Sequence, residues 1–165
     1  MAFSYKKDTS GWEKLKKQLL SMDKTELQVG WFDTYYGSEN SNLPHAFVAE
    51  LNEFGHTNGP DAMIPGAQTP PRPFMRVGFR EFIEKGRADQ NFLAVIKTVI
   101  SGQNVFKAMN QAGPYFVKHL QKVMDEWDTP PNARLTIELK GFNDPLNKTH
   151  QLIDKVDYRV ERKGK

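Results

Sequence analysis

The longest helical pattern in the chain is NVFKAMNQAGPYFVKHLQKVMDEWD, which spans Asn104 to Asp128. Its apolar side chains recur at steps of three and four residues, the spacing that places them along one face of an α-helix. The pair Gly113-Pro114 lies within it, and a proline removes one helical hydrogen bond and clashes with the preceding turn. The sequence therefore predicts a long amphipathic helix with a kink or a break near Gly113.

Apolar residues at the same spacing predict further helices on both sides of this segment. Residues suited to a helix start or stop bound several of them, including Ser10, Pro44, Gly55 and Thr149. The expected helices cover residues 10–22, 44–54, 75–86, 92–102 and, as a short helix capped by Thr149, residues 149–153.

Alternation of polar and apolar residues predicts three β-strands. They cover residues 26–32, 133–140 and 156–160, with a helix as the alternative for residues 133–140. We therefore predict an α+β fold in which several helices, including the long one near Asn104 to Asp128, pack on a small β-sheet. A length of 165 residues agrees with a single domain over residues 1–165.

From Gly55 to Pro73 the chain follows neither period and contains five of its ten prolines. Loops longer than about 12 to 15 residues inside a compact domain tend to be functional or disordered. Proline fixes φ and lowers the entropy lost on ordering, which suits docking against a partner surface. We therefore expect residues 55–73 to form an extended docking arm, with a mobile surface loop as the alternative.

The net positive charge is concentrated near the C-terminus. The chain has 23 Lys and Arg against 20 Asp and Glu, and residues 155–165 contain five basic and two acidic side chains. The rest of the chain is therefore neutral overall, whereas non-specific nucleic-acid binding needs a surplus of cations to release counterions. Residues 161–165 are expected to form a basic tail.

The composition excludes several kinds of chemistry. Cysteine is absent, so there is no thiolate nucleophile, no cysteine zinc site and no disulfide framework. The histidines lack metal-ligand spacing, Glu50 and Glu53 are expected to be a solvated pair, and nucleotide-binding and hydrolase signatures are missing. No segment predicts a signal peptide or a membrane span. We therefore predict no enzyme activity, no cofactor or metal and no membrane association, with synthesis in the cytoplasm.

Three arginines, Arg72, Arg76 and Arg80, are spaced four residues apart. On the helix predicted next to them, this spacing places side chains in one basic stripe that can contact phosphates or acidic groups of a partner. The alternative is a solvated face in which Arg80 pairs with Glu84.

The segment VAELNEFG at residues 48–55 is followed by Ile64-Pro65 and then by PRPFMR at residues 71–76. This order resembles a signature of the tail-completion and head-tail joining (neck) proteins of tailed bacteriophages. In that family a helix ends in Glu-Phe-Gly, a variable loop follows, and Ile-Pro and then Arg-Pro-Phe-aliphatic-Arg open the next helix. The segment DPLNKTHQL at residues 144–152 stands where the family commonly has Pro-Leu-Ile-Asp-Thr-Gly-x-Leu, with His150 in place of the glycine and Asn147-Lys148 in place of Ile-Asp. Residues 27–32 resemble the family's first strand.

The resemblance spans about residues 26–160 and implies a structural virion protein. It implies assembly as a ring, sixfold or twelvefold, in the neck or at the head-proximal end of the tail. There the ring would contact connector or adaptor proteins and tail-terminator or tail proteins, while DNA passes through the channel without tight specific binding. We expect the interface at Phe54, Ile64, Pro65, Pro71, Arg72, Pro73, Phe74, Arg76 and Arg80.

Two alternatives to the virion protein stay open. One is a small nucleic-acid-binding protein that uses the arginine stripe and the basic tail. The other is a hydrolase, for which the sequence offers no identifiable nucleophile and base.

Overall fold

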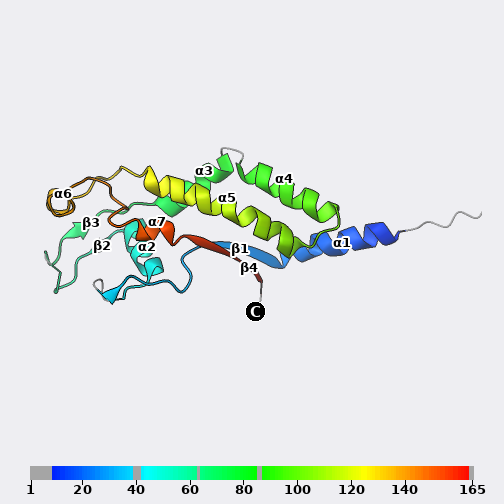
Figure 1. Ribbon diagram of the computed structural model, residues 1–165, viewed down its shortest axis with the longest axis horizontal. Helices are drawn as coiled ribbons and strands as arrows, with labels where there is room; N and C mark the ends of the chain where they lie inside the picture. Colours follow the sequence, from blue (N-terminus) through cyan, green and yellow to red (C-terminus); the bar gives the residue numbers. More distant parts are fainter. Residues whose placement is uncertain (1–8, 39–41, 63, 85–86, 164–165) are drawn as a thin grey trace, which may run out of the picture.

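The computed structural model of the chain describes residues 9–38, 42–62, 64–84 and 87–163. These residues form helices packed on small antiparallel sheets (Figure 1), so the predicted α+β class is confirmed. In chain order the elements are α1 (Ser10–Asp23), β1 (Thr25–Gly30), α2 (His45–Phe54), β2 (His56–Thr57), β3 (Gln68–Thr69), α3 (Phe74–Glu84), α4 (Arg87–Ile100), α5 (Val105–Asp125), α6 (Arg134–Lys140), α7 (Gln151–Asp154) and β4 (Asp157–Arg162). The helix end predicted at Gly86 lies outside the described residues.

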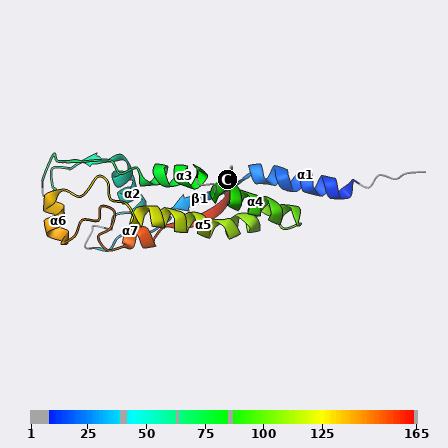
Figure 2. The same cartoon turned by 90° about the horizontal axis from the view of Figure 1, so that it is seen from above.

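The long helix α5 occupies the middle of the molecule. It packs against the sheet of β1 and β4 and also against α3 and α4 (Figure 1 and Figure 2). The strands β1 and β4 are antiparallel, with Thr25 opposite Arg162 and Gly30 opposite Asp157. Glu161 and Arg162, which the sequence placed in a basic tail, therefore belong to a strand, while residues 164–165 lie outside the described residues. The sheet thus joins segments from opposite ends of the sequence.

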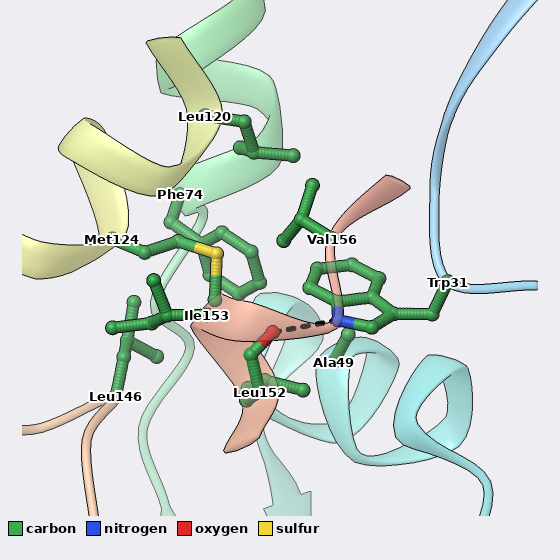
Figure 3. Packing of buried hydrophobic residues seen from close by; sticks show 9 residues of the cluster. All are labelled: Trp31, Ala49, Phe74, Leu120, Met124, Leu146, Leu152, Ile153 and Val156. Carbon is green, nitrogen blue, oxygen red and sulfur yellow. Dashed lines mark hydrogen bonds between the residues drawn. The ribbon is translucent and has the colours of Figure 1, made fainter. Parts of the chain in front are cut away.

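Two apolar clusters lie along α5. The larger one joins α5 to α2, α3, α7 and the segments beside them (Figure 3), and it consists of Trp31, Ala49, Phe74, Leu120, Met124, Leu146, Leu152, Ile153 and Val156. Within it the indole Nε1 of Trp31 donates a hydrogen bond to the carbonyl oxygen of Leu152 at 2.7 Å, so this ring is both packed and hydrogen-bonded. The second cluster joins α4 to the first half of α5 and consists of Val95, Val99, Val105, Ala108 and Ala112.

Of the kink or break predicted near Gly113, the break is wrong, because the helix α5 continues through Pro114. Pro114 has no N–H to donate to the carbonyl of Asn110, the acceptor one turn earlier. The hydroxyl of Tyr158 on β4 donates to that carbonyl instead, at 3.1 Å. Gly113 makes this approach possible, because a Cβ at that position would overlap the Tyr158 ring. A side chain from the sheet therefore replaces the backbone bond that the proline removes.

Replacing Tyr158 by phenylalanine is expected to lower the free energy of unfolding by about 1 kcal/mol, the typical worth of one hydrogen bond. The ring packing is kept, so the loss reports the bond to Asn110. Urea unfolding followed by circular dichroism measures it. Tyr115→Phe is the matched control, because Tyr115 is an exposed residue of α5, the helix that contains Asn110. Equal midpoints for the two variants would contradict the role of the Tyr158 hydroxyl.

Arg134–Lys140 form helix α6, whereas the sequence pattern favoured a strand over residues 133–140. The same letters also satisfy helical spacing, since Arg134 and Glu138 are four residues apart and their side chains pair at 3.0 Å. A strand needs a pairing partner, and no strand of the described sheets lies beside these residues. Gly141, with φ +81°, ends α6 in the left-handed conformation that favours glycine.

The short helix α7 begins after His150, which is its N-cap in place of the predicted Thr149. His150 has φ +56°, the left-handed conformation, at the position where the resembling family has glycine. The side chain of Asn147 holds this turn, because its Oδ1 accepts the backbone N–H of His150 at 2.9 Å. The amide nitrogen of Asn147 also lies 2.7 Å from His150 Nε2.

Candidate partner-binding surface

The end of α2, the arm and the start of α3 meet at one corner. Gly55, which follows α2, has φ +71°, and a Cβ on it would lie 2.6 Å from the carbonyl oxygen of Thr69 and 2.8 Å from the nitrogen of Pro71. The two ends of the arm therefore touch at a position where only glycine fits. This close approach explains why the Glu-Phe-Gly element has glycine at position 55.

Glu53 caps helix α3 from a different helix. Its Oε2 accepts the backbone N–H of Met75 at 2.8 Å, and its Oε1 accepts the backbone N–H of Arg76 at 3.2 Å. The guanidinium Nε of Arg76 also donates to Oε1, at 2.7 Å. Glu53 is 2% exposed, so the expectation of a solvated Glu50–Glu53 pair is wrong for Glu53. A carboxylate at a helix N-terminus satisfies free N–H groups and complements the helix dipole, which fixes α3 to the end of α2.

Arg72 clamps the far end of the arm to the segment after α5. Its guanidinium donates to the carbonyl oxygens of Pro130 and Pro131 at 3.3 and 3.4 Å, and to the side-chain oxygens of Asn52 and Asn132 at 3.4 Å each. Burial lowers the pKa of Arg72, and the residue is 5% exposed. Arg72 also precedes α3. The predicted stripe of three arginines on one helix is therefore wrong for Arg72, which has a structural contact set.

Arg76 and Arg80 are exposed on α3. Besides its ion pair with Glu53, the Arg76 guanidinium lies over the ring of Phe54, 5.0 Å from the ring centroid. Phe54 itself is exposed, so this cation–π pair forms part of the outer surface of the corner. Among the contacts of the described residues, no ion pair joins Arg80 to Glu84.

The arm contains a short hairpin. The strands β2 and β3 pair His56 with Thr69 and Thr57 with Gln68. The connection between them is held by the backbone of Asn58, whose N–H donates to Ala67 at 2.9 Å and whose carbonyl accepts from Gly66 at 3.0 Å. The hairpin lies at the end of the molecule opposite α1 (Figure 1).

The nine residues predicted to form the interface divide into two groups. Arg72 and Phe74 are buried and Pro73 is half-buried, so these three support the corner from inside. The exposed residues are Phe54, Ile64, Pro65, Pro71, Arg76 and Arg80. Of these, Phe54 and Arg76 touch, whereas Ile64 and Pro65 belong to the arm beyond β2.

Exposed apolar side chains occur well beyond the predicted interface. They include Trp12 on α1, Phe79 on α3, Phe92 on α4 and Leu139 on α6, each more than half exposed. Helical spacing in the sequence indicates these apolar faces, but it does not show which of them the rest of the chain leaves uncovered.

A hollow of about 450 Å³, lined by both polar and apolar side chains, lies between α2 and residues 145–152, and Lys140 is at its wall. Burial lowers the pKa of Lys140, partly opposed by the nearby carboxylate of Asp144. The Lys140 ammonium donates to the carbonyl oxygen of Asp144 at 2.5 Å, so the lysine holds the turn after α6. Within the described ranges, no three His, Asp or Glu side chains are grouped as metal ligands.

Among the helices that the structure describes, none has both the length and the apolar character needed to cross a bilayer. Comparisons with protein families, curated proteins and solved structures gave no match to this chain.

Proposed function

We propose that this chain is a structural virion protein of a tailed bacteriophage. In this proposal it forms a ring in the neck or at the head-proximal end of the tail and acts in tail completion or head-tail joining. Two of the sequence elements that resemble the neck proteins, residues 48–55 and residues 71–76, are in direct contact. Glu53 of the first element caps the helix that the second element, Arg-Pro-Phe-Met-Arg, opens. The resemblance therefore falls on residues that build one structural unit.

The observation that carries the proposal is the amount of apolar surface left open. A monomer rarely exposes apolar patches beyond a few hundred Å² unless they bind a partner. In this chain exposed large apolar residues lie on α1, α3, α4, α6 and the arm corner, and some are direct neighbours, as are Phe79 and Ile83, one turn apart on α3. A subunit of an assembly with neighbours on several sides needs such surfaces, whereas a protein that acts alone does not.

Closed rings use heterologous contacts, in which one patch of a subunit fits a different patch of the next. The proposed partners are further copies of this chain, connector or adaptor proteins, and tail-terminator or tail proteins. Apart from residues 155–165 the sequence is neutral, which agrees with DNA passing through the ring without tight binding, because phosphate contacts need surplus cations. We propose no catalytic role and a location in the virion.

The nucleic-acid-binding alternative receives less support. It relied on the arginine stripe and the basic tail, but Arg72 is buried and Arg76 is paired with Glu53. Arg80 is exposed and so gives the cleanest test. Under this alternative, Arg80→Ala would reduce the slope of log affinity for DNA against log salt concentration by about one, because one fewer counterion is released. Under the proposed function it leaves DNA binding unchanged and weakens docking to a virion partner.

Shortening the arm is expected to abolish head-tail joining while the monomer still folds. We would replace residues 58–67 by Asn-Gly, because a two-residue turn can connect the directly paired Thr57 and Gln68. The expected results are an unchanged thermal unfolding midpoint and loss of infectivity in a phage that carries the altered gene. The readouts are calorimetry of the purified chain, plaque counts and electron microscopy of unjoined heads and tails.

A matched control keeps the arm at full length and changes its sequence, with residues 58–67 replaced by a Gly/Ser linker of equal length. If rigid docking by the arm matters, this variant loses joining as well, whereas a pure spacer role predicts that it joins normally. Normal infectivity of the shortened variant would overturn the docking role of the arm. Quantitative mass spectrometry of purified virions tests the wider proposal, which requires a fixed copy number consistent with one ring per particle.

A further inference from the structure

The hollow between α2 and residues 145–152 lies against the packed core of the molecule. Its volume of about 450 Å³ falls within the roughly 300–1,000 Å³ typical of clefts that hold a ligand. The helices α2 and α7 pack against each other beside it (Figure 1). Leu146 and Leu152 line the hollow and also belong to the larger apolar cluster (Figure 3). Its floor is therefore part of the core.

The side chains around the hollow are held in place by contacts of their own. Tyr36 and Leu43, both on the wall, come from the segment before α2, and the N–H of Tyr36 donates to the carbonyl oxygen of Leu43 at 2.9 Å. The Tyr36 ring also packs on the buried ring of His45, with 4.1 Å between the ring centroids. Asn147, which is 8% exposed, fixes the turn at His150. A wall that is ordered in advance loses little conformational entropy when a ligand binds.

The charge at the hollow is positive. Lys140 and Lys148 line it, and among its described wall residues there is no aspartate or glutamate. Arg72 lies behind the wall, since its guanidinium donates at 3.4 Å to Oδ1 of Asn52, a wall residue. Burial lowers the pKa of Lys140, the carboxylate of Asp144 opposes this, and the charges of Arg72 and Lys148 lower it further. Three cations and one anion thus leave surplus positive charge here.

None of these three cations forms an ion pair with a carboxylate within the part of the chain that the structure describes. Arg72 contacts only neutral oxygens, those of carbonyls and side-chain amides. The Lys140 ammonium donates to a backbone carbonyl and lies 4.9 Å from the ring centroid of Phe142. Positive charge that is partly removed from water and lacks a counter-charge is stabilised by an anion nearby. The hollow therefore favours an anionic ligand.

The remaining wall residues select among anions. The wall has neither arginine nor glycine, which supply the guanidinium forks and the glycine-rich backbone cradles of many phosphate sites. Neutral donors are present on Tyr36, Thr149 and Gln151. Much of the wall is apolar, and its apolar side chains are Leu43, Val48, Pro145, Leu146 and Leu152. A carboxylate attached to an apolar body matches both parts of this wall.

We propose that the hollow binds the C-terminal residue of a peptide chain, with its carboxylate at Lys140 and Lys148 and an apolar side chain against Leu43 and Val48. Capture of a C-terminal carboxylate is one of the recurring modes of peptide recognition. A free amino acid fits less well, because its ammonium group would face the two lysines, whereas the same nitrogen in a peptide is a neutral amide. This inference goes beyond the proposed function and does not depend on it.

The test is an NMR titration of the full-length ¹⁵N-labelled chain with the peptide acetyl-Gly-Gly-Leu. The amide signals of residues 146–152 are expected to shift. The same peptide with a C-terminal amide is expected to bind about tenfold more weakly, because charge-assisted hydrogen bonds are lost. Acetyl-Gly-Gly-Gly, which keeps the carboxylate but has no apolar side chain, is expected to bind more weakly as well. Equal affinities for the acid and the amide would overturn the proposal.

Two lysine variants locate the carboxylate. Lys148→Gln is expected to weaken binding of the acid about fivefold, as for an exposed ion pair. Lys140→Gln keeps a donor for the Asp144 carbonyl and is expected to weaken binding about tenfold, because a half-buried charge is less screened. Neither variant is expected to change the weaker binding of the peptide amide, whereas a general loss of structure would affect both peptides.

Lys107→Gln is the matched control, because Lys107 is exposed near the start of α5 and does not line the hollow. It is expected to bind acetyl-Gly-Gly-Leu as the unchanged chain does. If Lys148→Gln and Lys140→Gln also bind unchanged, the carboxylate does not lie at these lysines and the proposal is wrong. Circular dichroism of each variant verifies that it folds.

Two further probes identify the source of the anion. Free leucine and inorganic phosphate are both expected to bind more weakly than acetyl-Gly-Gly-Leu. Leucine that binds as tightly as the peptide would assign the hollow to a free amino acid, and phosphate that binds as tightly would assign it to a phosphate ligand. Either result overturns the peptide terminus as the ligand but leaves the virion role untouched, whereas absence of the chain from virions overturns only the proposed function.

Discussion

Replacing Gly113 by alanine is expected to lower the free energy of unfolding by about 3 kcal/mol, the upper end of the usual cost of overpacking. An added Cβ would overlap the Tyr158 ring. The ring would have to move away, and its hydroxyl would then lose the bond that satisfies the Asn110 carbonyl. The change also separates β4 from α5, a contact near the middle of the fold.

The sign of this effect is diagnostic. At an open position inside a helix, glycine to alanine stabilises by about 1 kcal/mol. Gly11 lies in the first turn of α1, where nothing is within 4 Å of an added Cβ, so alanine there is expected to stabilise by less than this amount. Urea unfolding of Gly113→Ala and Gly11→Ala is therefore expected to move the midpoint in opposite directions. A stabilised Gly113→Ala would show that α5 and β4 do not pack as described.

Replacing Glu53 by alanine is expected to cost about 3 kcal/mol. The substitution removes a helix cap, worth roughly 0.5–2 kcal/mol, and leaves backbone N–H groups of Met75 and Arg76 without their acceptor, at about 1–3 kcal/mol for a buried donor. The ion pair with Arg76 adds less, because the Arg76 side chain is 60% exposed to solvent. The arm and α3 are expected to loosen together.

Glu50→Ala is the matched control, because Glu50 is exposed on the same helix. Its effect is expected to stay within about 0.5 kcal/mol, as for most surface substitutions. Glu53→Gln should fall between the two, since the amide keeps one acceptor oxygen but faces the second N–H with its own donor. Denaturant unfolding measures all three, and hydrogen exchange at the start of α3 localises the loss. Equal stabilities of Glu53→Ala and Glu50→Ala would contradict the capping role.

Part of the candidate surface could be predicted from the sequence. The Glu-Phe-Gly and Arg-Pro-Phe-Met-Arg elements meet at one corner of the molecule, and Phe54 and Arg76 lie together on its surface. The sequence did not predict which individual residues are exposed. In the structure Arg72 and Phe74 are buried, and Glu53 is a buried helix cap. An acidic residue shortly before a glycine, with arginines at the next helix start, was the available signal for that cap.

The main helices could be predicted from the sequence, because an amphipathic period of 3.6 residues is a local property and needs no knowledge of the partner surface. Tertiary structure alone decided the course of α5 through Pro114, since the hydroxyl that replaces its missing hydrogen bond comes from Tyr158 on β4. It likewise decided that residues 134–140 form a helix, because their pattern suits both periods and no described strand pairs with them. Which apolar faces stay open, those of α1 and α3 above all, follows from how the remaining elements pack, and contacts between distant segments leave no period in the sequence.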